Sequence, residues 1–508
     1  MSSKVLTVER FVGGIAVGDK EGIASSYRFG YGLNIHDEPS KFTALPSPIK
    51  VLGGNAGDTP AVGTTGLSGS VKWIVSGAPW IKAVFAYDEN GYLYKEDQAG
   101  TWTVIRAVAS SKGQGLSVLN NYLYYAQNGQ IGRYGPLNGA PVFTDNWSTT
   151  VSASGSYSNT MNDTTTFGFA PIFNFSKGFV CGNGNYISYF DGTNFNANRI
   201  ILPPQGTVMS LCRIEQYIMV ATIGGTSTLD NEEGFIFAWD GSSVTFNFFN
   251  NIEQGSNNCI ANYRNQPISI NGTIGTIYIG IDPFVKVHQL PKIPLTSSCQ
   301  VYPGAITSWK GKIYIGFAAP SDDRNFVRGL YAYGAKNNSY PDALSCDFLI
   351  STGNSGSTVS ITACKGTGNS LYMAWRDGTT VGIDKITNSN APQSTARIES
   401  LIFDDKRLPQ DKAATTIRVD HSILRVGESV SIYTRTNRAD DYTVARVVHS
   451  YTVGEDPNLA ATTRWKPDSG TARFQEYEWA VTIGSTTTSP EVYGISLQYD
   501  DLADENSI

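Results

Sequence analysis

The feature that most constrains the fold is a unit of short strands that recurs about seven times between residues 73 and 388. Each unit contains an apolar strand, a second strand rich in Tyr and Ile, and a third strand ending in an aromatic residue before Gly or Asp-Gly. The third-strand landmarks lie roughly 40 to 56 residues apart, which brackets the repeat lengths of β-propeller blades. The landmarks are Leu93-Tyr94, Arg133-Tyr134-Gly135, Tyr189-Phe190-Asp191-Gly192, Ala238-Trp239-Asp240-Gly241, Val285-Lys286-Val287, Tyr331-Ala332-Tyr333-Gly334 and Gly382-Ile383-Asp384. The repeat predicts an all-β chain with a β-propeller of roughly seven blades.

Composition agrees with this prediction. The 508 residues include 52 Gly, 27 Tyr and 23 Phe, and only 16% are charged, against about 25% in a typical soluble domain. Good helix formers never accumulate with a 3.6-residue period over more than about two turns. We therefore expect very little helix.

The pattern changes on both sides of the repeat, and this predicts three parts. Residues 1–72 form an N-terminal arm with entry strands, residues 73–388 the propeller, and residues 389–508 a C-terminal β-sandwich. The sandwich is predicted because five segments alternate apolar with polar residues. These segments are Thr416 to Asp420, Val430 to Thr434, Val444 to Val448, Phe474 to Ile483, and Val492 to Tyr499. Residues 396–403 either pair with the propeller or begin the sandwich, and the sequence leaves both alternatives open.

The six cysteines favour reduced thiols. Cys212 and Cys364 occupy the position in their repeats that Leu119 and Trp309 occupy in others, so both are interpreted as small apolar core residues. The six are scattered without C-x-x-C spacing, which argues against a zinc site. We expect no disulfide, metal or cofactor.

The residues that could carry catalysis do not form a recognisable pattern. The four histidines, His36, His288, His421 and His449, lack a nucleophile-elbow partner. The Asp-Gly pairs at Asp191, Asp240 and Asp377, and the stretch from Asp88 to Gly91, are interpreted as hairpin turns. We therefore expect no enzymatic activity.

Charge and hydropathy limit the classes of partner that the chain is expected to bind. The formal charge of −6 provides no basic footprint for tight nucleic-acid binding. No segment approaches the roughly 18 apolar residues of a membrane span, and the first ten residues include Lys4, Glu9 and Arg10, unlike a signal peptide. Synthesis in a cytoplasm is expected. The stretch Thr149 to Gly168 is nearly all Ser, Thr, Asn and Gly, so we expect a solvent-exposed loop, mobile or ordered by a partner.

The order of parts resembles the tail hub or nozzle proteins of short-tailed bacteriophages. The resemblance is carried by the Gly-rich arm Tyr27 to Ile35, by Ser400 to Asp404 with the two strands that follow it, and by the ending Thr488 to Tyr499. It implies a structural virion protein in the tail, made in the host cytoplasm. It also implies a ring of copies around a DNA channel, in contact with other tail or head-tail connector proteins, through which DNA passes without specific binding.

Two alternatives from other classes remain. A host receptor- or glycan-binding tail tip or fibre protein would use aromatic platforms on propeller loops. A propeller glycosidase would need a pair of carboxylates at a defined separation, and the sequence offers no clear pair.

The arm is the predicted contact with a neighbouring subunit. It has no repeat of its own to pack into, so its aromatic residues are expected to gain buried area from another copy. Tyr27, Phe29 and Tyr31 are the predicted anchors, and Arg28 is expected to pair across the interface.

Overall fold

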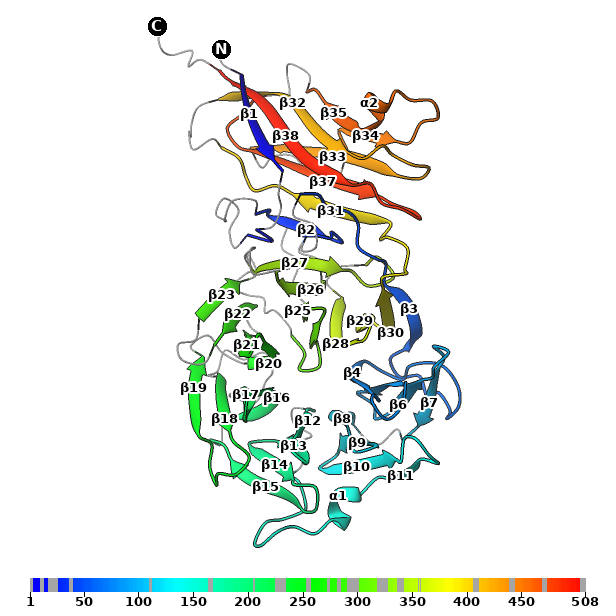
Figure 1. Cartoon of the computed structure of the whole chain (residues 1–508), viewed down its shortest axis with the longest axis vertical. Coiled ribbons are helices and arrows are strands. Elements are labelled where there is room, and N and C mark those ends of the chain that lie inside the picture. The colour runs from blue at the N-terminus through cyan, green and yellow to red at the C-terminus, as the bar shows by residue number, and fades with distance from the viewer. Residues whose placement is uncertain are drawn as a thin grey trace. The chain divides into compact units, whose positions relative to one another are not determined.

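The computed structural model of the chain confirms the all-β prediction (Figure 1). The described residues form 38 strands and two four-residue helices, α1 (Trp147–Thr150) and α2 (Pro457–Ala460). The structure describes residues 3–9, 13–16, 26–35, 40–108, 112–162, 168–203, 206–223, 234–252, 257–271, 275–280, 285–289, 301–317, 328–335, 342–354, 356, 358–404, 411–437, 444–467 and 473–502.

The chain divides into two compact units. The propeller unit holds residues 49–330 and 350–386, and the sandwich unit holds residues 1–48, 331–349 and 387–508. Strand β26 (Gly329–Gly334) spans the division. The units differ from the sequence-based boundaries at two places, since residues 49–72 belong with the propeller and residues 331–349 with the sandwich.

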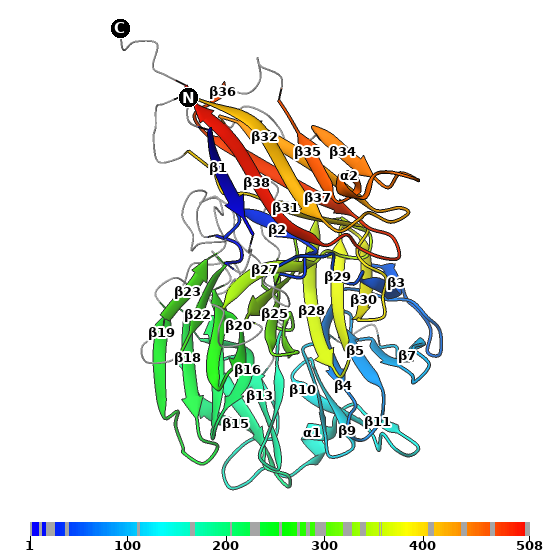
Figure 2. The same ribbon diagram turned by 45° about the horizontal axis from the view of Figure 1, so that its top comes forward.

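The propeller unit is built from four-stranded antiparallel sheets (Figure 2). It contains six complete sheets and a further hairpin. The sheets are β4 (Val71–Ser76), β5 (Val84–Asp88), β6 (Leu93–Glu96) and β7 (Trp102–Arg106); β8 (Gly115–Leu119), β9 (Tyr122–Gln127), β10 (Gln130–Gly135) and β11 (Val142–Thr144); β12 (Ile172–Phe175), β13 (Gly178–Asn183), β14 (Tyr186–Phe190) and β15 (Phe195–Ile201); β16 (Thr207–Ile214), β17 (Tyr217–Ile223), β18 (Gly234–Trp239) and β19 (Phe248–Ile252); β20 (Asn257–Tyr263), β21 (Gln266–Asn271), β22 (Thr276–Ile279) and β23 (Val285–Gln289); β28 (Val359–Thr367), β29 (Ser370–Asp377), β30 (Thr380–Thr387) and β3 (Ile49–Asn55). The hairpin joins β24 (Ile306–Trp309) to β25 (Lys312–Phe317).

These seven elements close into a ring. Each first strand contacts the first strand of the next element, in the order β4, β8, β12, β16, β20, β24 and β28, and β28 contacts β4 again. The seven-bladed propeller is confirmed. Its last blade takes its fourth strand from the N-terminal side of the chain, because β3 pairs antiparallel with β30 from Ile49 opposite Lys385 to Asn55 opposite Thr380.

Tight turns within the blades explain why the strands form hairpins. Asn120-Asn121 and Arg264-Asn265 have positive φ at both positions, as a two-residue hairpin turn of type I′ requires. Lys310-Gly311 has the same pair of positive φ angles between β24 and β25. Such turns match the right-handed twist of the flanking strands and fix their register.

The register corrects one sequence-based equivalence. Leu119 and Trp309 are the last residues of their first strands and lie opposite Tyr122 and Lys312. Cys212 lies two residues before the end of β16 and Cys364 three before the end of β28. The four positions are therefore not equivalent. Cys181, Cys212, Cys259, Cys346 and Cys364 are all buried, and none of these five forms a disulfide. Cys299 lies outside the described residues.

One landmark is also shifted. Val285-Lys286-Val287 lies in β23, the fourth strand of its blade, and the third strand is β22. The sequence placed it wrongly because β22 and β23 are joined by a short connection and both carry apolar residues at alternate positions.

Two third strands use glycine to accept a large ring from the neighbouring strand. A Cβ at Gly132 would stand 2.2 Å from the Tyr125 ring, and a Cβ at Gly382 would stand 2.4 Å from the Trp375 ring. Tyr125 and Trp375 are almost completely buried. The absence of a side chain on these glycines leaves the space that the rings occupy.

The sandwich unit contains two sheets. One has the order β1 (Ser3–Val8), β38 (Val492–Asp501), β32 (Lys412–His421) and β35 (Thr462–Trp465), with β36 (Arg473–Phe474) also pairing β32. The other runs β27 (Ala343–Phe348), β2 (Phe29–Tyr31), β31 (Thr395–Glu399), β37 (Tyr477–Gly484), β33 (Ser429–Thr436) and β34 (Val447–Ser450). Alternate residues such as Ile417, Ile432 and Leu497 are fully buried, as the alternation in the sequence predicted.

The alternatives for residues 396–403 are decided within this unit. Strand β31 pairs with β37 from Thr395 opposite Gly484 to Glu399 opposite Ala480, and it pairs with β2 on its other side. Residues 395–399 therefore form a strand of the sandwich.

The polar stretch from Thr149 to Gly168 is ordered by its own chain as far as it is described. The Phe195 and Ala197 amides of β15 donate to the carbonyls of Ser152 (3.0 Å) and Ser158 (2.7 Å). Met161 is buried in the same blade. Residues 163–167 lie outside the described part, so the predicted contact of this loop with a partner stays a prediction.

Candidate functional site

The four predicted interface residues lie in the sandwich unit. Tyr27, Phe29 and Arg28 are 2%, 3% and 5% exposed, and Tyr31 is half-buried. Strand β2 is positioned by parallel pairing with β27, where Tyr31 lies opposite Cys346, and by antiparallel pairing with β31. The four residues thus lie next to one another in β2 and just before it, and all but the half-buried Tyr31 are buried within their own chain.

Arg28 belongs to a buried network of charges. Its Nη1 donates to Oε2 of Glu478 at 2.7 Å, and its Nη2 lies 3.7 Å from Oε2 of Glu399. Arg435 binds both carboxylate oxygens of Glu478 through Nη2, at 2.7 and 2.8 Å, and Arg397 Nε donates to Oε1 of Glu399 at 2.8 Å. Burial raises the pKa of Glu399, while the guanidinium groups of Arg397 and Arg28 oppose that rise. Two carboxylates are thus held by three guanidinium groups, which is how buried charges are compensated in proteins.

An intersubunit role for these residues stays a prediction, and their burial does not favour it. The sequence indicated correctly that the aromatic arm needs a surface to pack on. It identified neither Glu399 nor Glu478 as the partners of Arg28, because both are more than 370 positions further along the chain. No local pattern signals a partner at such a distance.

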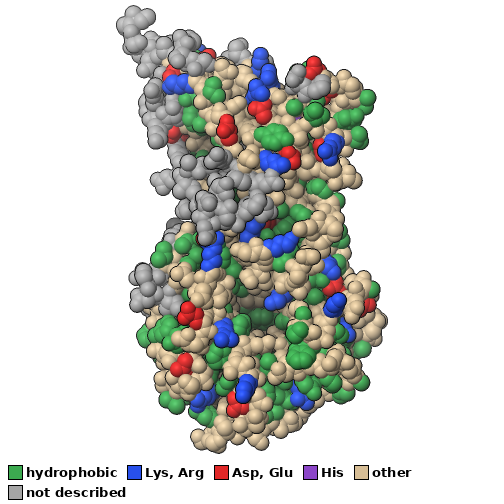
Figure 3. Space-filling model, in the orientation of Figure 1, with side chains coloured by type: hydrophobic (Ala, Val, Ile, Leu, Met, Phe, Trp, Pro, Cys, Tyr) green, Lys and Arg blue, Asp and Glu red, His purple; other side chains and the backbone are tan. Residues whose placement is uncertain are grey.

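The central channel is the site that the propeller itself defines. The first strands of all seven blades line a cavity of about 510 Å³. Figure 3 shows a hollow in this unit. Most of its lining is apolar or carries hydroxyl and amide groups, including Leu116, Ser210, Ile260 and Thr307. Its volume lies within the range of about 300–1,000 Å³ that is usual for small-molecule sites.

The charged groups of the channel are cationic. Arg213 and Lys365 are the charged residues among the described lining, and no carboxylate accompanies them there. Burial lowers the pKa of Lys365, and Arg213 donates from Nε to the Glu215 carbonyl at 2.7 Å. Such a lining would repel a free metal cation. Within the described residues, no group of three or more His, Cys, Asp or Glu could hold a metal ion.

Two histidines meet in the sandwich unit. The Thr463 hydroxyl lies 2.9 Å from Nε2 of His421 and 3.2 Å from Nδ1 of His449, and His449 Nε2 lies 3.1 Å from the carboxylate of Glu455. The order hydroxyl, imidazole, carboxylate is that of a catalytic triad. However, Thr463 is only 1% exposed, so its hydroxyl does not reach solvent or a substrate. His36 and the side chain of His288 lie outside the described residues.

The aspartate turns are confirmed. Asp88 Oδ1 accepts hydrogen bonds from the amides of Asn90 (3.0 Å) and Tyr92 (2.9 Å) between β5 and β6. Asp191 and Asp240 accept backbone amides in the same way, and Gly378 has φ of 59° after Asp377. Asp322 and Asp323 lie outside the described residues.

Among the described residues, no helix is long and apolar enough to cross a membrane.

Comparison with known proteins yields no family. No family model matches the chain, and no curated protein matches it. Solved structures that are similar include a crystal structure of a mitotic checkpoint complex, at 13% identity and a TM-score of 0.41, covering 65% of this chain and 97% of that one. A computationally designed protein, Ika8, is similar at 14% identity and a TM-score of 0.40, covering 73% of this chain and 99% of that one. Similarities this weak carry no functional argument.

Proposed function

We propose that the chain is a structural protein of a bacteriophage tail, of the hub or nozzle type, whose copies form a ring around the DNA ejection channel. Its neighbours in this proposal are other tail or head-tail connector proteins. DNA passes without specific binding, and the protein performs no chemical turnover. The proposal rests on the resemblance of the arm, propeller and sandwich order, and on one structural observation, the exposure of apolar side chains on an outer strand of each unit.

The propeller unit exposes aromatic side chains on β19. Phe249 is 56% exposed, and Phe248 beside it is also exposed. Together with Tyr217 and Val285 they line a groove of about 1060 Å³. Contiguous exposed apolar surface on a soluble protein marks an interaction site.

The sandwich unit exposes a second apolar surface around β34. Val448 on this strand is 58% exposed, and β34 pairs only with β33 among the described residues. Val444, Val453 and Leu459 in the adjoining segments are exposed as well. An edge strand with apolar side chains is a template for pairing with another chain.

A ring requires each copy to have two different contact surfaces. In a cyclic assembly of more than two copies, each subunit presents one patch to the preceding copy and a different patch to the next. The β19 surface and the β34 surface supply two such patches, and this supports assembly over an isolated role.

The oligomeric state of the purified chain tests the proposal. We expect mass photometry to detect a closed oligomer, and the fraction of chains in this oligomer should rise with protein concentration. Negative-stain images should show a ring. Phe249→Glu and Val448→Glu should each shift the population toward monomer, since a buried, unpaired charge disfavours the interface.

Val142→Glu is the matched control. Val142 is an exposed valine on β11, the outer strand of a different blade, and it does not line the β19 groove. A chain that stays monomeric at high micromolar concentration, or a ring unaffected by both test substitutions, would contradict the proposal.

A further inference from the structure

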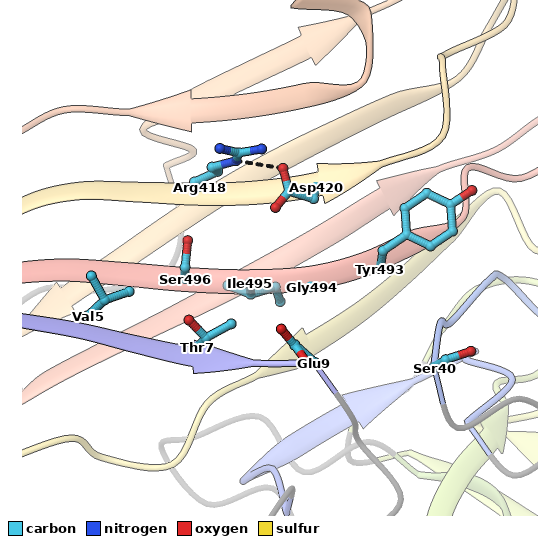
Figure 4. Close-up of a pocket in the computed structure, with 10 residues that line it drawn as sticks. All are labelled: Val5, Thr7, Glu9, Ser40, Arg418, Asp420, Tyr493, Gly494, Ile495 and Ser496. Atoms are coloured by element: carbon cyan, nitrogen blue, oxygen red, sulfur yellow. Dashed lines mark hydrogen bonds and ion pairs between the residues drawn. The ribbon is translucent and has the colours of Figure 1, made fainter. Parts of the chain in front are cut away.

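A second hollow lies on the face of the sandwich sheet formed by β1, β38 and β32 (Figure 4). It has a volume of about 480 Å³ and is lined from β1 and its end by Val5, Thr7 and Glu9, from β38 by residues 493–496, and from β32 by Arg418 and Asp420. Ser40, from a separate segment, completes the lining. The size suits a small ligand or one end of a longer one.

Gly494 forms the floor of this groove. It lies opposite Asp420 in the sheet, and its neighbour Ile495 lies opposite Val8, the residue before Glu9. A Cβ at Gly494 would stand 3.7 Å from the Val8 carbonyl oxygen and 3.8 Å from Glu9 Cγ. The backbone could therefore carry a side chain here without strain, and the glycine leaves open the space between the two carboxylates.

Tyr493 provides an aromatic wall. Its side chain is 42% exposed, and its hydroxyl donates to Oε2 of Glu491 at 2.8 Å. Glu491 is itself held by Lys41, whose Nζ lies 2.7 Å from Oε1. The phenol is thus anchored at its polar end while the apolar ring stays accessible, which prepares it for stacking on a ligand.

The remaining wall is polar and fixed by a charge pair. Arg418 Nε donates to Oδ1 of Asp420 at 2.6 Å, and Figure 4 shows this pair on β32, beside the part of β38 that carries Ser496 and Gly494. Thr7 and Ser496 lie opposite each other in the sheet and add two hydroxyl groups. The groove lining thus combines one exposed aromatic ring with side chains that donate and side chains that accept hydrogen bonds.

We propose that this groove binds a neutral oligosaccharide, with one pyranose ring stacked on Tyr493 over Gly494. A sugar ring presents an apolar C–H face and a rim of hydroxyls that both donate and accept, and the groove offers the matching set. Glu9 and Asp420 outnumber Arg418, so the local charge disfavours sialylated or phosphorylated ligands. The proposal is independent of ring formation, because the groove lies within one sandwich unit.

Glycan binding by the full-length chain tests this. An array of neutral oligosaccharides, sialylated oligosaccharides and bacterial polysaccharides identifies the ligand, and titration calorimetry with the strongest neutral oligosaccharide measures its association constant. We expect neutral oligosaccharides to bind. Tyr493→Ala should lose affinity roughly tenfold, which corresponds to about 1.4 kcal/mol, and Gly494→Leu should not bind, because its side chain fills the floor of the groove.

Tyr451→Ala is the matched control, because Tyr451 is 38% exposed in the same unit but does not line the groove. It should bind like the unaltered chain. Circular dichroism of each variant checks its fold. If Gly494→Leu does not fold, the proposal is tested by Tyr493→Ala alone. The proposal is overturned if the array yields only charged glycans or no binding at all, or if neither groove substitution weakens binding.

Discussion

At the scale of single residues, the structure separates charges that hold the fold from charges that face solvent. Arg28, Glu399 and Glu478 are almost fully buried, whereas Arg418 and Asp420 form an exposed pair at the sheet surface. Desolvation makes the two kinds of pair energetically different, since a broken buried pair leaves a charge without water or partner.

Replacing Arg28 by methionine should destabilise the sandwich unit by about 3 kcal/mol. This value is at the low end of the destabilisation that follows from breaking a buried ion pair. Glu478 would still pair with Arg435, and Glu399 would still pair with Arg397. Hydrogen exchange of the β31 and β37 amides in increasing denaturant measures the change in the free energy of unfolding. Arg418→Met is the control and should cost less than about 1 kcal/mol. Equal effects of both substitutions would contradict the assigned role of Arg28.

Asp88 should make the propeller unit less stable as pH rises. Burial raises the pKa of Asp88 to about 6, although hydrogen bonds from Tyr94, Tyr92 and Asn90 oppose the rise. The folded state therefore binds the proton more tightly than the unfolded state. The stabilisation is complete below about pH 4, the usual pKa range of aspartate, and is lost as pH rises through about 6.

Urea unfolding at pH 4 and pH 7 measures this effect. The free energy of unfolding of the unaltered chain should fall between pH 4 and pH 7. In the Asp88→Asn variant this fall should be smaller than in the unaltered chain by up to about 3 kcal/mol. A residual loss is expected from Asp384, whose pKa burial also raises to about 6. Asp240→Asn serves as the control, because backbone hydrogen bonds from Ser243 and Ser242 lower the pKa of Asp240 and give the opposite sign. An unchanged pH dependence in Asp88→Asn would refute the assignment.

At the scale of elements, the N-terminal segment supplies strands to sheets whose other members are distant in the sequence. Strand β1 pairs with β38 over six residues, β2 lies between β27 and β31, and β3 closes the last propeller blade. The segment that the sequence described as an arm is thus three edge or bridging strands. Their removal should affect each unit differently.

Deleting residues 1–40 should destabilise the sandwich unit and leave the propeller unit folded. The deletion removes β1 and β2 but keeps β3, so the last blade remains complete. Hydrogen exchange should show lost protection in β31 and β38 and unchanged protection in β9 and β13, which act as an internal reference. Unchanged β31 and β38 would show that the arm is dispensable for folding and would revive its predicted use as a contact with another subunit.

At the scale of the whole molecule, the chain passes between its two units several times. The sandwich unit draws on the N-terminal segment, on residues 331–349 and on residues from 387 onward, while the ring of seven first strands closes within the propeller unit. The strands whose contacts close the ring all belong to the propeller unit. This unit can therefore keep its fold when the sandwich unit is removed.

A chain truncated after residue 388 should therefore keep its propeller. Strand β31 belongs to the sandwich, so its loss removes no strand from the seven-bladed ring. Protected amides in β5, β9, β13, β17 and β29 by hydrogen exchange would confirm this. Aggregation of the truncated chain, relieved by extending it to Asp405, would show instead that residues 389–405 support the propeller.

The features that the sequence alone determined are those with local causes. Alternation of apolar and polar residues specified the sandwich strands, the repeat spacing specified seven blades, and Asp-Gly pairs such as Asp191-Gly192 specified turns, because each depends on neighbours a few positions away. Register within a strand was less certain, which is why Cys212 and Cys364 were aligned incorrectly.

Only the tertiary structure decided how distant segments combine. The partners of Arg28, the pairing of β3 with β30, and the groove over Gly494 join residues separated by hundreds of positions. Burial and hydrogen bonding select such partners among many segments of similar local pattern, and no periodicity within one segment records which was selected. For that reason the aromatic arm could be predicted to need a packing surface, while the identity of that surface, its own chain, required the fold.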